Sequence, residues 1–159
     1  MPLEPTEPTV EDESSHLLRV VIDTNLIMTA ILSSTGAAAK LIDWFTKERD
    51  YFQMLLSSPI WRGYQAVAKW LIPESRHQER ERIFNILAAQ ADWIEPATTL
   101  DICPDPGDNR FLECAVAGYA DYLVTKNIKH FPQKSYQGVQ IVRIGQFLTV
   151  LEKLEQQQG

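Results

Sequence analysis

The sequence predicts an α/β domain with a mostly parallel sheet that helices cover on both faces. Apolar, β-branched runs alternate along the chain with helical patterns, which is the order typical of a parallel sheet. The chain has 159 residues, of which 45% are hydrophobic and 23% charged, and this suits one globular domain with its own core. The seven glycines form no glycine-rich phosphate loop, so neither a dinucleotide site nor a P-loop is expected.

Negative charge is concentrated at the start of the chain. Residues 1–16 hold five acids and no lysine or arginine, and they account for most of the net charge of −6. Their prolines and the absence of a hydrophobic period predict a disordered acidic tail, followed by a domain over residues 17–155. The rest of the chain is nearly neutral, so a nucleic-acid site would need local bases rather than an overall positive field.

We expect a cytoplasmic protein without a leader peptide or a membrane span. The start of the chain lacks a basic region followed by an apolar one, and the apolar runs are far shorter than the roughly 18 residues of a span. Cys103 and Cys114 show neither a disulfide framework nor the spacing of a metal finger. The two cysteines are therefore predicted to be reduced thiols.

The first third of the chain predicts two strands separated by two helices. A continuous apolar run over 17–22 is typical of a buried parallel strand. Residues 26–32 predict a short helix and 37–47 a second one, and residues 52–56 predict the next strand. This order is that of a crossover between parallel strands.

Two further helices are predicted in the middle of the chain. Ser57 or Ser58 can cap the first, Pro59 suits its first turn, and Pro73 ends it. The second is expected over 75–91, with its many charges on a solvated face. The apolar residues expected to face inward from the two helices are Ile60, Tyr64, Val67, Leu71, Ile83, Ile86 and Leu87.

The last third predicts short strands and two helices. Residues 93–95 are a candidate short strand, and 122–125 and 140–144 are two more. Residues 105–108 have strong turn chemistry, and a helix is expected to follow them directly. A final helix is expected to fray over 156–159. The inward residues predicted for the two helices are Phe111, Leu112, Ala115, Val116, Phe147, Leu148, Leu151 and Leu154.

Polar residues follow the strands where a parallel sheet binds its ligands, at the carboxyl ends. Asp23 follows the first strand, Asn127 follows a later one, and Asp108 begins the helix between them. Such oxygen ligands suit Mg²⁺ or Mn²⁺, and a cation there could activate water for phosphodiester cleavage. The alternative is structural: Asp23 and Asp108 cap helices, Asp105 belongs to a turn, and Asn127 shapes a loop.

Three bases lie near these positions in the sequence. Lys126, Lys129 and Arg110 could hold phosphates beside the metal, or they could be ordinary exposed residues. His130 is the only histidine near the expected site, and we interpret it as a loop histidine because nothing nearby in the sequence orients it.

Three segments, in this order, resemble the PIN-domain family. They are VVIDTN at 20–25, DPGDNRFLECA at 105–115 and ADYLVTKNIKHF at 120–131. The similarity covers about residues 18–148 and is greatest to VapC-like ribonuclease toxins of bacterial type II toxin–antitoxin systems. The resemblance implies a three-layer α/β/α fold and a metal-dependent endoribonuclease.

The resemblance also implies roles for particular residues. Asp23 and Asp108 match the catalytic acids, and with Asn127 they would hold Mg²⁺ or Mn²⁺. Toxins of this family usually form homodimers and are silenced by a cognate antitoxin protein, with RNA as the substrate. The residues expected to bind RNA, two from the resemblance and three from their charge, are Asn25, Thr125, Lys126, Lys129 and Arg110.

This chain departs from the family pattern at two positions. The family generally has a glutamate just ahead of the position of Tyr64, where this chain has Arg62 and Gly63, and it often has an aspartate at Asn127. Fewer carboxylates predict weaker metal binding, although Asp105 or phosphate oxygens of RNA could supply ligands. A catalytically degenerate PIN fold that binds RNA or protein is therefore the alternative, and an α/β domain without any metal is a third.

Overall fold

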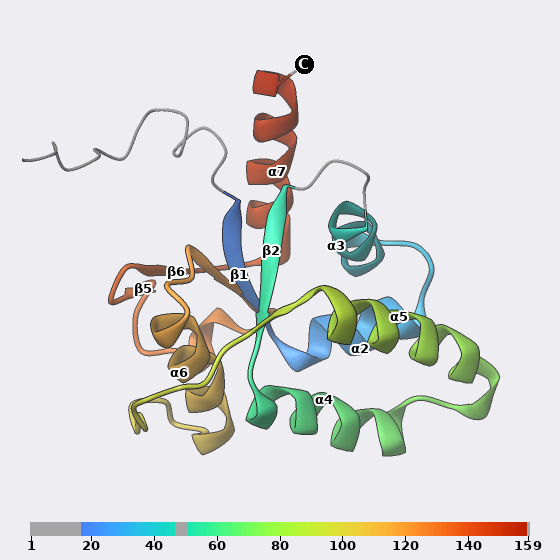
Figure 1. Ribbon diagram of the computed structural model, residues 1–159, viewed down its shortest axis with the longest axis horizontal. Coiled ribbons are helices and arrows are strands. Elements are labelled where there is room, and N and C mark those ends of the chain that lie inside the picture. Colours follow the sequence, from blue (N-terminus) through green and yellow to red (C-terminus); the bar gives the residue numbers. More distant parts are fainter. Residues whose placement is uncertain (1–16, 47–50, 159) are drawn as a thin grey trace, which may run out of the picture.

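The computed structural model describes residues 17–46 and 51–158 (Figure 1). The predicted acidic tail over 1–16, and Lys47 at the end of a predicted helix, lie outside the described residues. Cys103 and Cys114 are both free thiols and both buried, as the sequence predicts.

A six-stranded sheet runs through the centre of the described structure, in the order β3-β2-β1-β4-β6-β5. Every neighbouring pair is parallel except β5 and β6, so the prediction of a mostly parallel sheet is confirmed. The strands are β1 Leu18–Ile22, β2 Phe52–Leu56, β3 Asp92–Trp93, β4 Tyr122–Val124, β5 Ser135–Tyr136 and β6 Val139–Val142.

Strand β5 is the one strand that the sequence pattern did not predict. It has only two residues, and a two-residue turn joins it to β6. Gln137 and Gly138 in that turn both have positive φ angles, 47° and 88°, which is the backbone of a type I′ hairpin turn. The strand expected at 140–144 stops at Val142, because the last helix begins two residues later.

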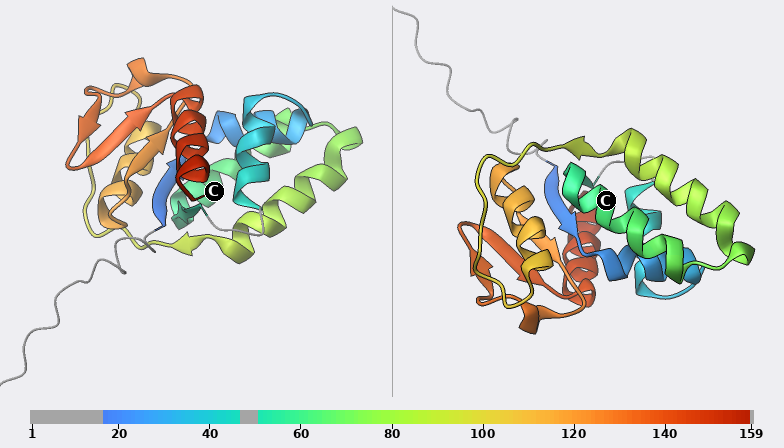
Figure 2. Two further views of the ribbon diagram at one scale, coloured as in Figure 1. Left: turned by 90° about the horizontal axis from the view of Figure 1, so that it is seen from above. Right: turned by 90° about the horizontal axis from the view of Figure 1, so that it is seen from below.

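The helices form layers on both sides of the sheet, so the predicted three-layer α/β/α fold is confirmed. Helices α3 and α7 contact each other, as do α4 and α6, and in Figure 2 the sheet lies between α6 and α7. The helices are α2 Thr24–Leu32, α3 Ala37–Phe45, α4 Ser58–Leu71, α5 His77–Gln90, α6 Asn109–Ala117 and α7 Ile144–Gln158. Short 3₁₀-helices cover Glu74–Arg76, Pro106–Asp108 and Ile128–His130.

The central strands β1 and β2 form the middle of the core. All three residues of the Val20–Ile22 run are fully buried, and Phe52 of β2 packs its ring edge-on against Phe147 of α7. This burial fixes both faces of β1, so the residue that follows the strand is held in place by the core.

The inward faces of some helices differ from the predicted ones. On α4 the buried residues are Ile60, Tyr64 and Ala68, whereas Leu71 is exposed. The stripe follows a spacing of four, so it turns away from Leu71 by the end of the helix. On α5 Phe84 is buried. The predicted inward residues that are only partly buried are Val67, Ile86, Val116, Leu148 and Leu154.

The last helix was expected to fray over 156–159 but continues to Gln158. Among the described residues, no single helix has the length and apolar character needed to cross a membrane. Helices α2 and α3 meet that test only as a pair, and they are bent by 97° at the break between them.

Candidate functional site

Asp23 lies directly after β1, where the strand ends and α2 begins. Its backbone N–H donates to the carbonyl oxygen of Val124 at 2.9 Å, which extends the pairing of β1 with β4 by one residue. Its own carbonyl oxygen accepts the N–H of Leu26 at 3.1 Å, within the first turn of α2. The residue is buried, so strand and helix together fix it at the carboxyl edge of the sheet, where the sequence places it.

Thr125 lies at the same edge, directly after β4, and it is completely buried. Its hydroxyl donates to Oδ2 of Asp23 at 2.7 Å and accepts the backbone N–H of Asn127 at 3.0 Å. The hydroxyl therefore orients the carboxylate and the loop after β4 together. The role predicted for Thr125 was contact with substrate, which stays a prediction; the contact that the structure gives is with Asp23.

Tyr64 supports this edge of the sheet from α4. Its fully buried hydroxyl donates to the carbonyl oxygen of Ile22 at 2.5 Å, one residue before Asp23. Burial raises the pKa of Tyr64 well above its usual value, and the nearby Asp23 and Cys114 add to this shift. Tyr64 therefore stays protonated and acts as a fixed donor, a role that its place on the apolar face of the helix did not reveal.

Asp108 ends the 3₁₀-helix Pro106–Asp108, just before α6. Its side chain is 13% exposed, and its buried Oδ2 has no hydrogen-bond partner. The pKa of Asp108 is raised to about 6, chiefly by burial and then by the negative charges of Asp105 and Asp23. The two aspartates predicted to share a site thus lie within electrostatic reach of each other.

His130 faces Asp108 from the 3₁₀-helix Ile128–His130. Its Nδ1 lies 3.3 Å from Oδ2 of Asp108, within the range of an ion pair, but the geometry makes no hydrogen bond. A positive His130 lowers the pKa of Asp108 and so opposes part of the shift. His130 is half exposed in a short turn, as expected of a loop histidine, but the sequence did not predict that Asp108 lies beside it.

The described contacts do not support the alternative that the two aspartates are only helix caps. Neither Asp23 nor Asp108 makes a side-chain capping hydrogen bond. Asp105 has that role instead, because its Oδ1 accepts the N–H of Gly107 at 2.9 Å. The interpretation of Asp105 as a turn residue is confirmed.

Two buried residues of α6 hold the loop that leads to Asp108, and sequence reasoning missed both. Oδ1 of Asn109 accepts the backbone N–H groups of Ile102 and Cys103, each at 3.0 Å. Oε2 of Glu113 accepts the N–H of Leu100 at 2.8 Å. The sequence does contain a signal for both: each is a polar residue on the apolar face of the helix. A buried polar group needs a hydrogen-bond partner, so each could have been predicted to bind a neighbouring segment.

The predicted substrate-binding residues differ in how they are held. Lys126, Lys129 and Asn25 are exposed around the site. Arg110 is not an independent base, because its guanidinium donates to Oε2 of Glu113 at 2.7 Å. Its expected contact with phosphate would have to share the guanidinium with that carboxylate.

The positions where the family has a glutamate lie on the second turn of α4. Arg62 is exposed, and a Cβ atom added to Gly63 would meet no heavy atom within 4 Å. A side chain could therefore begin at Gly63 without its Cβ displacing a neighbour, so crowding at that atom does not explain why this position is a glycine.

The residues present fit a hard divalent cation that keeps several waters. Asp23 and Asp108 offer carboxylate oxygens, and Oδ2 of Asp108 is a buried acceptor that makes no hydrogen bond and has the half-exposed His130 at ion-pair distance. Mg²⁺ is commonly held by one or two carboxylates, with phosphate oxygens and waters completing the shell. No group of three or more His, Cys, Asp or Glu side chains at metal-binding positions occurs in residues 17–46 and 51–158. The donor set is therefore a reduced one, as its sequence predicts.

Comparisons with known proteins show which family the chain resembles. Residues 19–129 match the family model of the PIN domain. The uncharacterized protein MJ1680 of Methanocaldococcus jannaschii is 30% identical over 105 residues, which is 62% of this chain and 64% of that protein. The match thus spans less than two thirds of the relative's length.

A solved structure shares the fold. It is a chain in the crystal structure of VapBC2 from Rickettsia felis bound to a DNA fragment from their promoter. The match has a TM-score of 0.52 at 18% identity and covers 79% of this chain and 98% of that one. Since the family model covers most of the chain, the protein belongs to the PIN-domain family.

Proposed function

We propose that this PIN domain is a metal-dependent endoribonuclease in which Asp23 and Asp108 hold Mg²⁺ or Mn²⁺. The observation that carries the proposal is the pairing of two unlike carboxylates at one edge of the sheet. Asp23 is fixed by Thr125, while Asp108 has a raised pKa and a buried oxygen without a hydrogen-bond partner. A divalent cation would satisfy that oxygen and offset the repulsion between the two acids.

Each residue of the site has a distinct task in this mechanism. A bound Mg²⁺ or Mn²⁺ supplies an activated water and stabilises the charge on the phosphate during cleavage. Asp23 and Asp108 would hold the cation, Asn127 would add an amide oxygen, and Asp105 would be an extra ligand. Thr125 fixes the orientation of the Asp23 carboxylate through its hydrogen bond to Oδ2.

Exposed bases hold the RNA near the cation. Lys126 and Lys129 flank Asn127 and are exposed, so each can bind a phosphate oxygen. Asn25, in the first turn of α2, can reach the same strand of RNA. Arg110 contributes more weakly, because Glu113 already holds its guanidinium.

The test is cleavage of single-stranded RNA by the purified protein with Mn²⁺, Mg²⁺ or EDTA. Cleavage with either metal, lost in EDTA and in Asp23→Asn, is the expected result. Asp43→Asn is the matched control, because Asp43 is exposed on α3 and undergoes the same change. Equal cleavage by Asp23→Asn and the parent would refute the mechanism.

A PIN fold that binds without cutting is the second candidate, favoured by Arg62 and Gly63 where the family has an acid. The double variant Gly63→Glu with Asn127→Asp restores the acids that this chain lacks. Cleavage gained only in that variant supports the binding role, whereas comparable cleavage by the parent excludes it.

The remaining family expectations are part of the same proposal. A cognate antitoxin protein silences the nuclease, the protein is a cytoplasmic homodimer, and the PIN-like domain spans residues 17–155. Light scattering coupled to gel filtration tests the dimer, and a monomeric mass across micromolar concentrations would exclude it.

A further inference from the structure

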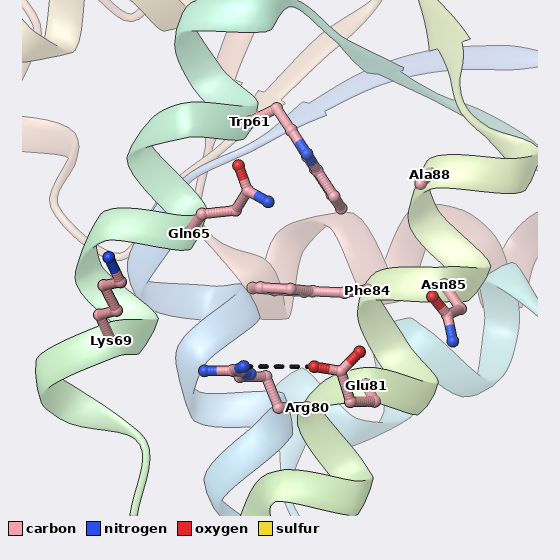
Figure 3. A pocket seen from close by; sticks show the side chains of 8 residues that line it. All are labelled: Trp61, Gln65, Lys69, Arg80, Glu81, Phe84, Asn85 and Ala88. Carbon is pink, nitrogen blue, oxygen red and sulfur yellow. Dashed lines mark hydrogen bonds and ion pairs between the residues drawn. The ribbon is translucent and has the colours of Figure 1, made fainter.

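A cavity of about 290 Å³ lies between α4 and α5 (Figure 3). Its volume is near the lower end of the roughly 300–1,000 Å³ typical of ligand pockets. Both helices line it, and none of its lining residues belongs to the strand-end site. Its lining includes Trp61, Gln65 and Lys69 of α4, and Arg80, Glu81 and Phe84 of α5.

The lining side chains form two facing stripes with different chemistry at each end. Trp61 and Phe84 pack together with ring centroids 5.2 Å apart, and Figure 3 shows both rings projecting into the space between the helices. Lys69 and Arg80 lie toward the other end of the cavity. Phe84 follows Arg80 by four positions on α5, which is about 6 Å along the helix.

The cationic end has hydrogen-bonding capacity that its neighbours do not use. The guanidinium of Arg80 donates to Oε1 of Glu81 at 3.2 Å, while its buried Nε–H has no partner. An arginine carries five N–H donors, so Arg80 can also donate to an anion in the cavity. Glu81 is itself shared, because Nε2 of His77 lies 3.9 Å from the same oxygen.

Charge at the mouth of the cavity favours an anion. Among its lining residues Lys69 and Arg80 are positive and Glu81 is negative, which leaves an excess of positive charge. Lys69 is exposed in the last turn of α4, so it can move toward a ligand at little cost in packing.

An aromatic surface next to two cations suits a nucleotide. Bases stack on aromatic side chains in proteins that bind single strands, and cations beside them hold the phosphates. The amide of Gln65 points into the same space from α4 (Figure 3) and offers both a donor and an acceptor to a base edge. A peptide would need two separate residues to supply the ring and the anion that one nucleotide combines.

Helix α4 joins this cavity to the strand-end site. Tyr64, on its inward face, donates to the carbonyl oxygen of Ile22 beside Asp23, while Trp61 and Gln65 face the cavity. A single strand of RNA that leaves the strand-end site along α4 would therefore meet the cavity.

We propose that the cavity between α4 and α5 binds one nucleotide of a single-stranded RNA, with its base on Trp61, which Phe84 supports from below, and its phosphate between Lys69 and Arg80. The inference rests on the proposed function, because the RNA substrate is the ligand that reaches this face. The cavity would add a contact outside the strand-end site, and this contact would fix the position of the bound RNA.

The experiment measures binding without cleavage. Fluorescence anisotropy in EDTA follows a short fluorescein-labelled single-stranded RNA of mixed sequence as it binds the full chain. The Lys69→Gln/Arg80→Gln double variant removes the cations, and Trp61→Leu removes the partly exposed stacking surface. The matched control is Lys40→Gln/Lys153→Gln, which removes the same charge from exposed positions on α3 and α7.

The expected result separates the two ends of the cavity. Loss of the cations weakens binding about tenfold and lowers the slope of log Kd against log salt by about 0.7, the value for one neutralised phosphate of a single strand. Trp61→Leu weakens binding about fivefold or more with the slope unchanged. The control binds as the parent does, and thermal unfolding shows that each variant is folded.

Three results would overturn the inference. They are a parent that binds no RNA in EDTA, cavity variants that bind as tightly as the control, and a free nucleoside monophosphate that binds as tightly as the RNA. Failure of the proposed function looks different, because the cavity variants would still weaken binding while no metal restored cleavage. Normal cleavage with unaltered binding in the cavity variants would instead reject the cavity alone.

Discussion

Asp23 and Asp108 lie at the same edge of the sheet but are held in opposite ways. Asp23 has a strand behind it, a helix after it and a hydroxyl on its carboxylate. Asp108 comes from a 3₁₀ turn, and its Oδ2 meets only the exposed ring of His130 at ion-pair distance. The first acid is a fixed point of the fold, and the second is a buried charge that the fold leaves unsatisfied.

This difference shows where the fold gives up stability for a site. An unpaired buried carboxylate is costly, and the raised pKa of Asp108 reports that cost. A bound cation would remove the cost only where the protein leaves an oxygen available. Asp108 has such an oxygen in Oδ2. Asp23 also has one, because Thr125 binds only Oδ2 of its carboxylate.

The largest expected effect comes from removing the hydroxyl that fixes Asp23. Thr125→Val keeps the shape but leaves the Asp23 carboxylate and the N–H of Asn127 without this partner. We expect cleavage to fall at least tenfold and the free energy of unfolding to fall by about 1–3 kcal/mol. RNA cleavage rates and urea unfolding measure the two effects.

Thr125→Ser is the control for that variant, since it keeps the hydroxyl and loses only a methyl group. Recovery of most of the cleavage by serine would confirm that Thr125 acts through orientation of Asp23. Cleavage by Thr125→Val at the parent's rate would show that the carboxylate needs no such support.

The second-largest effect concerns Asp108. Its replacement should stabilise the folded protein, whereas Thr125→Val should destabilise it. The folded protein holds the Asp108 proton more tightly than the unfolded chain does, since its pKa is about 6 against an ordinary value of about 4. Without metal, the parent should therefore lose stability relative to Asp108→Asn as the pH rises from about 4 to about 6. Above pH 6 the variant should be more stable by about 1–3 kcal/mol.

Urea unfolding of both proteins in EDTA, across that pH range, measures this difference. Addition of Mn²⁺ at neutral pH should stabilise the parent and leave Asp108→Asn nearly unchanged, because only the parent keeps both carboxylates. A variant that is less stable than the parent at neutral pH would contradict the unsatisfied state of Asp108.

The third effect is on metal affinity, when a carboxylate is introduced at Gly63. Gly63→Glu places a carboxylate where the added Cβ meets no neighbour, and we expect it to tighten Mn²⁺ binding about tenfold because ligand charge sets the affinity of hard cations. Calorimetric titration with Mn²⁺ measures this change. Ala66→Glu, at an exposed position on the same helix, is the control and should leave the affinity unaltered.

The sequence predicts the fold better than it predicts the supports of the site. Buried strands such as Val20–Ile22 are visible as continuous apolar runs, so the positions of Asp23 and Thr125 at the sheet edge follow from topology. Strand β5 escaped prediction because two residues carry no period, and its pairing depends on the turn at Gln137 and Gly138.

The residues that hold the site were harder to predict because their partners are distant in the chain. Tyr64 donates to a residue 42 positions away, and Glu113 reaches a loop 13 positions away. Local patterns give Tyr64 only an apolar face and Glu113 only a place on a helix. Long-range packing decides both roles, so no single stretch of the sequence contains them.

The smallest effect tests how far His130 already compensates for the unsatisfied acid. When protonated, the ring lowers the pKa of Asp108, but half of the side chain is exposed and the attraction is screened by water. In His130→Gln the pKa of Asp108 should rise. The loss of stability of His130→Gln relative to the double variant His130→Gln/Asp108→Asn should therefore occur at a higher pH than the loss of the parent relative to Asp108→Asn. We expect the effect on stability to stay below about 1 kcal/mol. Urea unfolding against pH, with His77→Gln as the exposed control, measures it. An unchanged transition pH would mean that His130 does not compensate for the charge of Asp108, so that a metal ion is the counter-charge this carboxylate requires.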